Sequence, residues 1–126
     1  MQITCGTDII EIERIKQAIL THEQKFLQEV YTPAEIAYCE SKKDSKYQHF
    51  AARFAAKEAI FKAIAGFYED KFTISWQNAE IVNDNNGKPI VTLIDVKQKN
   101  LHLDISISHC NEYAIAMCIA TLGGET

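Results

Sequence analysis

The stretch FAARFAAKEAIFKAI, residues 50–64, combines phenylalanine, alanine and isoleucine with four charged side chains. Just before it, SKYQ (45–48) has the pattern of a helix start, with Ser45 as the N-cap. Gly66 follows as a stop signal. The sequence therefore predicts a largely buried helix that begins near Ser45 and runs to Gly66.

The charged residues of this predicted helix occupy defined sectors. At about 100° per residue, Arg53 and Lys57 lie side by side, whereas Glu58 and Lys62 flank the far side of a phenylalanine sector. An exposed Glu58–Lys62 pair would contribute only about 0.3–0.5 kcal/mol. Alternatively, the charged groups border a buried surface and hold a phosphate together with its metal ion. The helix alone leaves both interpretations open.

Upstream of this helix we expect a short strand and further helices. QITC (2–5) is extended, and Gly6 can release the chain into a turn. From Asp8 to Val30, apolar residues recur at helical spacing, in one helix or in two broken near Thr21–His22. TPAE (32–35) starts another helix, with Thr32 as N-cap, Pro33 in the first position and Glu35 reaching back.

Downstream of Gly66 the pattern changes to strands. The candidates are FTISW (72–76), AEIVND (79–84), IVTLI (90–94), LHLDISIS (101–108) and YAIAMCIA (113–120). NDNNGKP (83–89) predicts a hairpin turn in which Asn86-Gly87 supplies positive φ and Pro89 ends the turn. Helices first and antiparallel strands later predict an α+β fold, with N-terminal helices packed on a C-terminal, mostly antiparallel sheet.

The last two predicted strands differ in their faces. In LHLDISIS, leucine and isoleucine alternate with polar residues, so one face is apolar. In YAIAMCIA, large apolar residues alternate with small ones and there is no polar face, so we expect both sides to be covered. The small side suits close packing against the alanine-rich helix or against another subunit.

Composition limits the class of protein. The 126 residues predict one domain spanning 1–126, and 47% hydrophobic with 24% charged residues is typical of a globular protein. A net charge of −4 argues against a general nucleic-acid binder. No apolar run approaches the roughly 20 residues of a membrane helix, and the N-terminus lacks a signal-peptide pattern. Four scattered cysteines without a CxxC pair suit reduced thiols, and a cytoplasmic protein is the expectation.

Two polar motifs are candidates for chemistry. Asp8 can cap a helix, because DIIE (8–11) is a capping-box variant, or it can share a divalent cation with Glu58. In SISHC (106–110), the serines and His109 suggest nucleophilic catalysis, but neither an orienting acid nor a nucleophile elbow is present. A serine hydrolase is therefore disfavoured, and a strand-end His109 is more typical of a turn or a phosphate contact.

Four segments together resemble the holo-acyl-carrier-protein synthase family, the small phosphopantetheinyl transferases. They are GTDIIEIER (6–14), FAARFAAKEAIFKAI (50–64), NGKP (86–89) and SISH (106–109). The resemblance implies the 4'-phosphopantetheinyl transferase fold and a magnesium-dependent enzyme of fatty acid biosynthesis. Such an enzyme moves the 4'-phosphopantetheine arm of coenzyme A to a serine of apo acyl carrier protein and releases 3',5'-ADP. It also implies a homotrimer that binds coenzyme A at each subunit boundary.

The same resemblance implies roles for individual residues. Asp8 and Glu58 would be the Mg²⁺ ligands, and Lys62 a catalytic cation at a phosphate oxygen or the leaving group. Arg53 and His109 are candidates for the 3'-phosphate of coenzyme A, and Lys57 for further phosphate neutralisation. The base is open between a metal-bound water, a carboxylate-held water and Glu58 itself.

The resemblance also implies residues that bind the nucleotide at the subunit boundary and a residue that contacts the acyl carrier protein. Gly87, Lys88 and Pro89 of NGKP, together with Ser108 and His109 of SISH, would face the nucleotide from the neighbouring subunit.

Arg14 matches the family position that meets the acidic carrier, although it can also pair with Glu11 at i,i+3. The stretch after it adds only Lys16 and Lys25, so Lys42, Lys43 and Lys46 of SKKDSK (41–46) are candidates for the remaining positive charge.

Two other functions remain open on the sequence. One is a non-catalytic oligomer that binds a nucleotide or phosphate, and the other is a transferase that acts on a different carrier domain.

Overall fold

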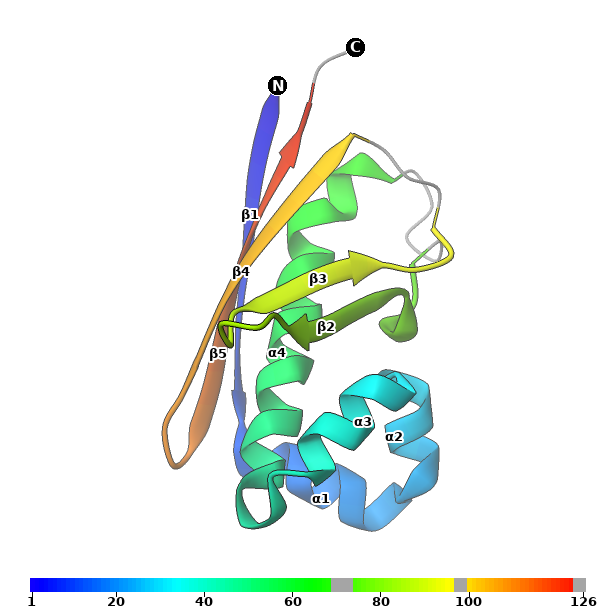
Figure 1. Ribbon diagram of the computed structural model, residues 1–126, viewed down its shortest axis with the longest axis vertical. Coiled ribbons are helices and arrows are strands. Elements are labelled where there is room, and N and C mark those ends of the chain that lie inside the picture. The colour runs from blue at the N-terminus through cyan, green and yellow to red at the C-terminus, as the bar shows by residue number, and fades with distance from the viewer. Residues whose placement is uncertain (69–73, 97–99, 124–126) are drawn as a thin grey trace.

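The computed structural model describes residues 1–68, 74–96 and 100–123 (Figure 1). The helices of this part are α1 (Ile12–His22), α2 (Gln24–Val30), α3 (Pro33–Glu40) and α4 (Lys46–Ile64), with 3-10 turns η1 (Lys43–Ser45), η2 (Ala65–Phe67) and η3 (Trp76–Asn78). The strands are β1 (Gln2–Glu11), β2 (Ala79–Asn83), β3 (Pro89–Leu93), β4 (Leu101–His109) and β5 (Tyr113–Leu122).

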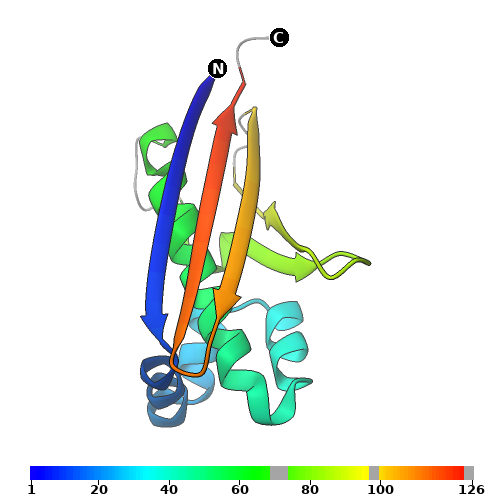
Figure 2. The same cartoon turned by 90° about the vertical axis from the view of Figure 1, so that its left-hand side faces the viewer.

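The strands form two antiparallel sheets, which confirms the predicted α+β class. One sheet has the order β1-β5-β4, and the other is the β2–β3 hairpin. Helix α4 runs along one face of the three-stranded sheet, and α1, α2 and α3 gather at one end of the molecule (Figures 1 and 2). The N-terminal segment thus contributes an edge strand to the sheet, in addition to the predicted C-terminal strands.

Strand β1 is longer than the sequence predicts. It pairs with β5 without a break from Gln2↔Leu122 to Glu11↔Tyr113, so the predicted turn at Gly6 is wrong. The predicted helix start at Asp8 is also wrong, because α1 begins only at Ile12. Ten residues of ladder pairing with a distant strand outweigh the local capping signal of DIIE. Asp8 therefore lies in a strand and does not cap a helix.

Several local signals are confirmed. Thr32 and Glu35 form a capping box with Pro33 in the first turn of α3. The first helical region is divided at Glu23, next to the predicted break, where φ is 49°. Gly87 has a φ of 83° in the predicted turn between β2 and β3, whereas Asn86, expected to share this conformation, does not have a positive φ.

Two local predictions fail. Ser45 precedes α4, but its side chain makes no capping bond and instead donates to the Lys42 carbonyl. The predicted strand FTISW is wrong over residues 74–76, because Ile74 and Ser75 are irregular and Trp76 begins the turn η3. Residues 72 and 73 of that segment lie outside the described residues.

Helix α4 forms the middle layer of the molecule. Its alanine face, which includes Ala56, Ala59 and Ala63, packs against the small residues Ala116, Cys118 and Ala120 of β5. The opposite side contacts α3 and the start of β2. Short side chains on both surfaces allow the helix to lie close to the sheet.

The two faces of the three-stranded sheet differ sharply. The small side of β5 is buried against α4, as predicted, but the large side is exposed. A single chain therefore covers one side of β5, and coverage of the other side stays a prediction for the assembled protein. This uncovered surface, here called the outer face, faces the viewer in Figure 2. None of the helices in the described part of the chain is both long and apolar enough to cross a membrane.

Candidate active site

Gly6 brings strand β1 into direct contact with helix α4. A Cβ at Gly6 would overlap the carbonyl oxygen of Ala59 and would lie 2.8 Å from the Ala63 nitrogen and 2.9 Å from Lys62 Cβ. Thr4, two residues earlier on the same face, donates from Oγ1 to the Ala63 carbonyl at 2.5 Å. Because side chains alternate along a strand, Asp8 lies on this face as well and points toward α4.

Asp8, Glu58 and Lys62 meet where β1 crosses α4. Lys62 Nζ lies 3.3 Å from Asp8 Oδ1 and donates to the Thr7 carbonyl at 2.9 Å. Lys62 thus reaches across to β1, and the ion pairs of the described residues do not include the i,i+4 pair with Glu58. The structure brings together the three residues that the resemblance names as catalytic.

The surroundings of Glu58 disfavour the charged form of its carboxyl. Partial burial raises its pKa, the neighbouring Asp8 carboxylate raises it further, and the Lys62 ammonium lowers it in part. Two carboxylates that repel each other beside a single lysine form a centre of negative charge. A divalent cation between them would relieve this repulsion.

The donor set suits magnesium better than zinc. Within the described ranges, no group of three or more His, Cys, Asp or Glu side chains is arranged to hold a metal ion. Mg²⁺ commonly binds one or two protein carboxylates and completes its octahedron with water and substrate phosphates. Asp8 and Glu58 can supply such a half-open site. The two residues therefore fit a hard cation that arrives with a phosphate ligand.

A shallow pocket opens beside these residues. It has a volume of about 350 Å³ and is lined by Thr7, Asp8, Ile9, Lys62 and Ile115. Asp8 and Lys62 belong to the inner side of the sheet, whereas Ile9 and Ile115 belong to the outer face. The pocket thus wraps around the free edge of β1 and joins the candidate site to the outer face.

Arg53 lies in a second polar cluster, around Tyr38. Its guanidinium carbon is 4.2 Å from the centre of the Tyr38 ring, and Nη2 donates to Asn83 Oδ1 at 3.4 Å. Asn83 donates in turn to the Tyr38 hydroxyl at 2.9 Å. Arg53 is only 3% exposed, and in the part of the chain that the structure describes its Nε has no hydrogen-bond partner.

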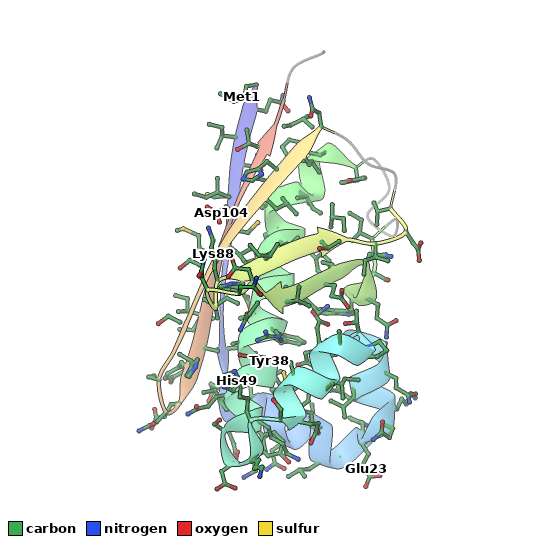
Figure 3. All side chains as sticks on the ribbon, viewed as in Figure 1. Met1, Glu23, Tyr38, His49, Lys88 and Asp104 are labelled. Carbon is green, nitrogen blue, oxygen red and sulfur yellow. The ribbon has the colours of Figure 1, made fainter. Side chains whose placement is uncertain are left out.

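Two histidines extend this cluster to strand β4. The His49 ring lies 5.7 Å from Tyr38 and 5.7 Å from His109, and Figure 3 shows Tyr38 and His49 side by side. Burial lowers the pKa of His49, and the charges of Arg53, Lys42 and His109 lower it further. Lys42 lies over the Tyr38 ring at 4.8 Å. The cluster thus gathers basic groups, which is the chemistry of an anion site.

Tyr38, His49 and Asn83 were not predicted as site residues. They come from α3, α4 and β2, and no local pattern marks them. The sequence had indicated this cluster only through their partners Arg53 and His109.

The structure contradicts the predicted phosphate-binding role of Lys57. This side chain is completely buried, and its ammonium lies 2.9 Å from Glu35 Oε1. It also donates to the carbonyls of Trp76 and Ala79, so its three N–H groups are all engaged inside the protein. On the helical wheel Lys57 neighbours Arg53, but the packing of α3 and β2 over α4 encloses it. No donor remains for a bound phosphate.

The residues of NGKP and SISH lie away from Asp8 and Glu58 within one chain. Lys88, between Gly87 and Pro89, forms an exposed ion pair of 3.3 Å with Asp104 of β4, visible in Figure 3. Ser108 pairs with Ile115 and lies on the outer face, whereas His109 pairs with Ala114 and lies on the inner side. Strand β5 separates β4 from β1. A single chain therefore does not unite these residues with the carboxylates.

Arg14 is exposed on α1. The ion pairs of the described residues do not include one with Glu11, which is the last residue of β1. Nearby, Lys16 and Lys46 lie over the Tyr47 ring at 5.5 and 5.3 Å. Arg14 is thus accessible to a partner.

Comparison with known proteins identifies the family. The model of the 4'-phosphopantetheinyl transferase superfamily matches residues 4–118. A holo-[acyl-carrier-protein] synthase from Ruminiclostridium cellulolyticum is 44% identical, with 98% of this chain and 95% of the relative covered. The chain belongs to the 4'-phosphopantetheinyl transferase superfamily.

Two solved structures are similar over nearly the whole chain. The Helicobacter pylori holo-[acyl-carrier-protein] synthase in complex with coenzyme A is 32% identical, with a TM-score of 0.80 and coverage of 93% of this chain and 99% of the other. The Bacillus anthracis holo-(acyl-carrier-protein) synthase in complex with CoA (3',5'-ADP) is 34% identical, with a TM-score of 0.76 and coverage of 93% and 94%.

Proposed function

We propose that this protein is a holo-[acyl-carrier-protein] synthase that serves fatty acid biosynthesis. It transfers the 4'-phosphopantetheine arm of coenzyme A to a serine of apo acyl carrier protein. The observation that carries this proposal is the meeting of Asp8, Glu58 and Lys62 in a member of the phosphopantetheinyl transferase superfamily. Coenzyme A is the substrate, consistent with the two similar proteins whose structures contain it.

The reaction is a phosphoryl-type transfer. The serine oxygen of the carrier forms a bond to the phosphorus that bears the pantetheine arm, and the bond from that phosphorus to the oxygen of 3',5'-ADP breaks. The serine proton leaves to a base. Catalysis of this kind depends mainly on positioning and on neutralising the charge of the diphosphate.

Asp8 and Glu58 would hold Mg²⁺, with the diphosphate of coenzyme A completing its ligands. When bound, the ion withdraws negative charge from the phosphate oxygens. Lys62 supplies a further positive charge at a phosphate oxygen or at the departing 3',5'-ADP. The raised pKa of Glu58 also makes this carboxyl a candidate for taking the serine proton, directly or through a water.

Arg53 and His109 are proposed to bind the 3'-phosphate of coenzyme A. The unused Nε of Arg53 and the basic groups around Tyr38 support this role. A planar guanidinium and an imidazole are suitable donors to a phosphate monoester. Lys57 is not part of this proposal, because its donors are engaged in the interior.

We propose that three chains assemble around their outer faces. This surface carries exposed apolar side chains that are 43% to 64% accessible: Ile3, Ile9, Tyr113, Ile115, Met117 and Ile119. A contiguous exposed apolar patch of this kind is typical of a contact surface between proteins. The pocket beside Asp8 continues onto this patch through Ile9 and Ile115. A neighbouring subunit there would bring its Gly87, Lys88, Pro89 and Ser108 toward the nucleotide.

Arg14 is proposed to contact the acidic carrier protein. Lys16 and Lys46 beside Tyr47 extend the positive charge near α1. Lys42 and Lys43, at the start of the turn η1, are further candidates. Charged contacts of this type mainly accelerate association and weaken with salt.

The deciding experiment is a transfer assay with coenzyme A, Mg²⁺ and a panel of apo carrier proteins, analysed by intact mass. We expect the acyl carrier protein to gain the mass of one phosphopantetheine arm. If this chain leaves every carrier unmodified while a known transferase modifies them, the proposal fails. Tight binding of coenzyme A without product would identify a non-catalytic binding protein. Modification of a different carrier alone would identify that carrier, and not the acyl carrier protein, as the substrate.

A further inference from the structure

Lys57 and Glu35 form a completely buried ion pair, and Lys57 directly precedes Glu58 of the candidate active site in the sequence. Lys57 Nζ has three acceptors around it: Glu35 Oε1 at 2.9 Å, the Trp76 carbonyl at 2.8 Å and the Ala79 carbonyl at 2.6 Å. An ammonium group has three N–H donors, so its hydrogen-bonding capacity is filled. Such a group tolerates very little rotation or sliding of the helix that carries it.

The carboxylate of Glu35 extends the connection to other elements. Its Oε1 accepts from the Thr32 backbone at 2.9 Å, and its Oε2 accepts from the Ile81 backbone at 2.8 Å. The pair therefore ties α4 to the first turn of α3, to the turn η3 and to strand β2. Each of these contacts lies on the side of α4 away from the three-stranded sheet.

Apart from the Gly6 contact, the Thr4–Ala63 hydrogen bond and the contacts of Lys62 with β1, the packing of helix α4 on the sheet is mostly apolar. Most of its circumference is apolar, and alanines provide the contact with the sheet. Lys57 and Ala59 are two residues apart, or about 200° around the helix, so they lie on nearly opposite sides. Glu58 falls between them. A change in the rotation of α4 would therefore move Glu58 and Lys62 away from Asp8.

Buried ion pairs are inefficient as stabilising devices. The cost of removing two charges from water often cancels their attraction, so apolar replacements can be equally stable. The pair instead fixes the orientation of α4, because its hydrogen bonds form in only one arrangement of the helix relative to α3 and β2. Apolar packing of small side chains can accept several similar arrangements.

We propose that the Glu35–Lys57 pair is a positioning device that sets the rotation and height of α4, so that Glu58 and Lys62 face Asp8. This inference rests on the proposed function, because it assigns the pair a role in building the metal site of that reaction. Glu35 and Lys57 are positioning residues, since neither touches the substrate.

The test compares wild type with the double variant Glu35→Gln/Lys57→Gln, which removes both charges and keeps polar side chains. The control is Leu27→Ala in α2, which truncates another buried side chain and destabilises the protein but leaves both charges of the pair in place. Thermal unfolding first establishes a temperature at which all three proteins are folded. Binding of Mn²⁺, a probe for the carboxylate pair, is then measured by electron paramagnetic resonance in the presence of coenzyme A.

We expect the double variant to bind Mn²⁺ about 10- to 100-fold more weakly, as for other residues that orient metal ligands. Its apparent KM for Mg²⁺ in the transfer assay should rise by a similar factor, whereas Leu27→Ala keeps wild-type Mn²⁺ affinity. Wild-type Mn²⁺ affinity in the double variant, or an equal loss in Leu27→Ala, would overturn the inference. If the double variant does not fold, Glu35→Gln/Lys57→Met, which removes both charges and fills the space of the lysine with an apolar side chain, carries the same expectation. Absence of transfer by the wild type would instead refute the proposed function.

Discussion

Gly6 of strand β1 lies directly against the Ala59 carbonyl of helix α4, with no space for a side chain between them. This contact determines how near Asp8, two residues along the same face of β1, comes to Glu58 and Lys62. The geometry of the candidate active site thus depends on glycine at position 6, which has no Cβ and lets β1 approach α4 closely.

Gly6→Ala should impair both folding and activity. Its Cβ would overlap the Ala59 carbonyl oxygen, which is backbone and cannot rotate away. Forcing β1 and α4 apart should lower the free energy of unfolding by about 1–3 kcal/mol or more. Urea denaturation and the transfer rate of the folded fraction measure the two effects. Gly66→Ala is the matched control, because no atom lies within 4 Å of its added Cβ. Equal behaviour of the two variants would refute the importance of the close approach.

Glu58→Gln should abolish most activity without destabilising the protein. Loss of a metal ligand should lower kcat by about 100-fold or more, since metal-ion catalysis contributes several kcal/mol. The raised pKa of Glu58 favours its protonated form in the folded state, so its stabilising contribution is present at low pH and is lost as pH rises through that pKa. The neutral amide of the variant avoids this loss. At neutral pH the variant should therefore melt at the wild-type temperature or above it.

The same shift predicts how metal binding depends on pH. Protonation of Glu58 removes a ligand, so Mn²⁺ affinity should fall as pH decreases through a value above the ordinary 4.5 of a glutamate. A titration of Mn²⁺ affinity against pH measures this. Flat affinity through that range, or a strong destabilisation of Glu58→Gln, would favour a purely structural carboxylate.

Met117→Lys should disrupt assembly. Met117 lies on β5 in the middle of the exposed apolar patch, and a buried lysine between subunits would lack a partner. Sedimentation or light scattering should show a shift from trimer toward monomer, with a parallel loss of transfer activity. Leu20→Lys is the control, since Leu20 is a similarly exposed apolar residue that lies on helix α1, outside the sheet. A wild-type assembly for Met117→Lys would show that the outer face is not the interface.

Arg53→Lys should selectively weaken recognition of the 3'-phosphate. Lysine keeps the charge but loses the planar guanidinium that lies over Tyr38 and reaches Asn83. Loss of a charged hydrogen bond costs about 1.5–3 kcal/mol, so the KM for coenzyme A should rise at least about tenfold. The comparison substrate is 3'-dephospho coenzyme A, for which wild type and variant should have similar KM values. An equal rise for both substrates would place Arg53 elsewhere in the reaction.

Local patterns predicted those parts of the molecule in which neighbouring residues decide the conformation. The capping box of Thr32 and Glu35, the hairpin turn at Gly87, the helical course of α4 and the alternation along β4 and β5 are of this kind. The sequence also predicted the two candidate carboxylates, Asp8 and Glu58, because GTDIIEIER and FAARFAAKEAIFKAI both resemble segments of the same family. In each case the information lies within a short window of the chain.

The tertiary structure alone decided the length of β1, the burial of Lys57 and the direction of the Lys62 side chain. Strand β1 continues to Glu11 because it pairs with β5 at the far end of the chain, which no local capping signal reveals. Lys57 is internal because α3, η3 and β2 close over one side of α4 and provide Glu35 and two carbonyls as partners.

Lys62 turns toward Asp8 because Gly6 lets the strand approach. The sequence by itself determined which residues are helical, extended or charged, since backbone preference and hydrophobic periodicity are local. Which charges face a substrate and which are sealed in the interior depends on the packing of distant segments, and only the folded chain sets that.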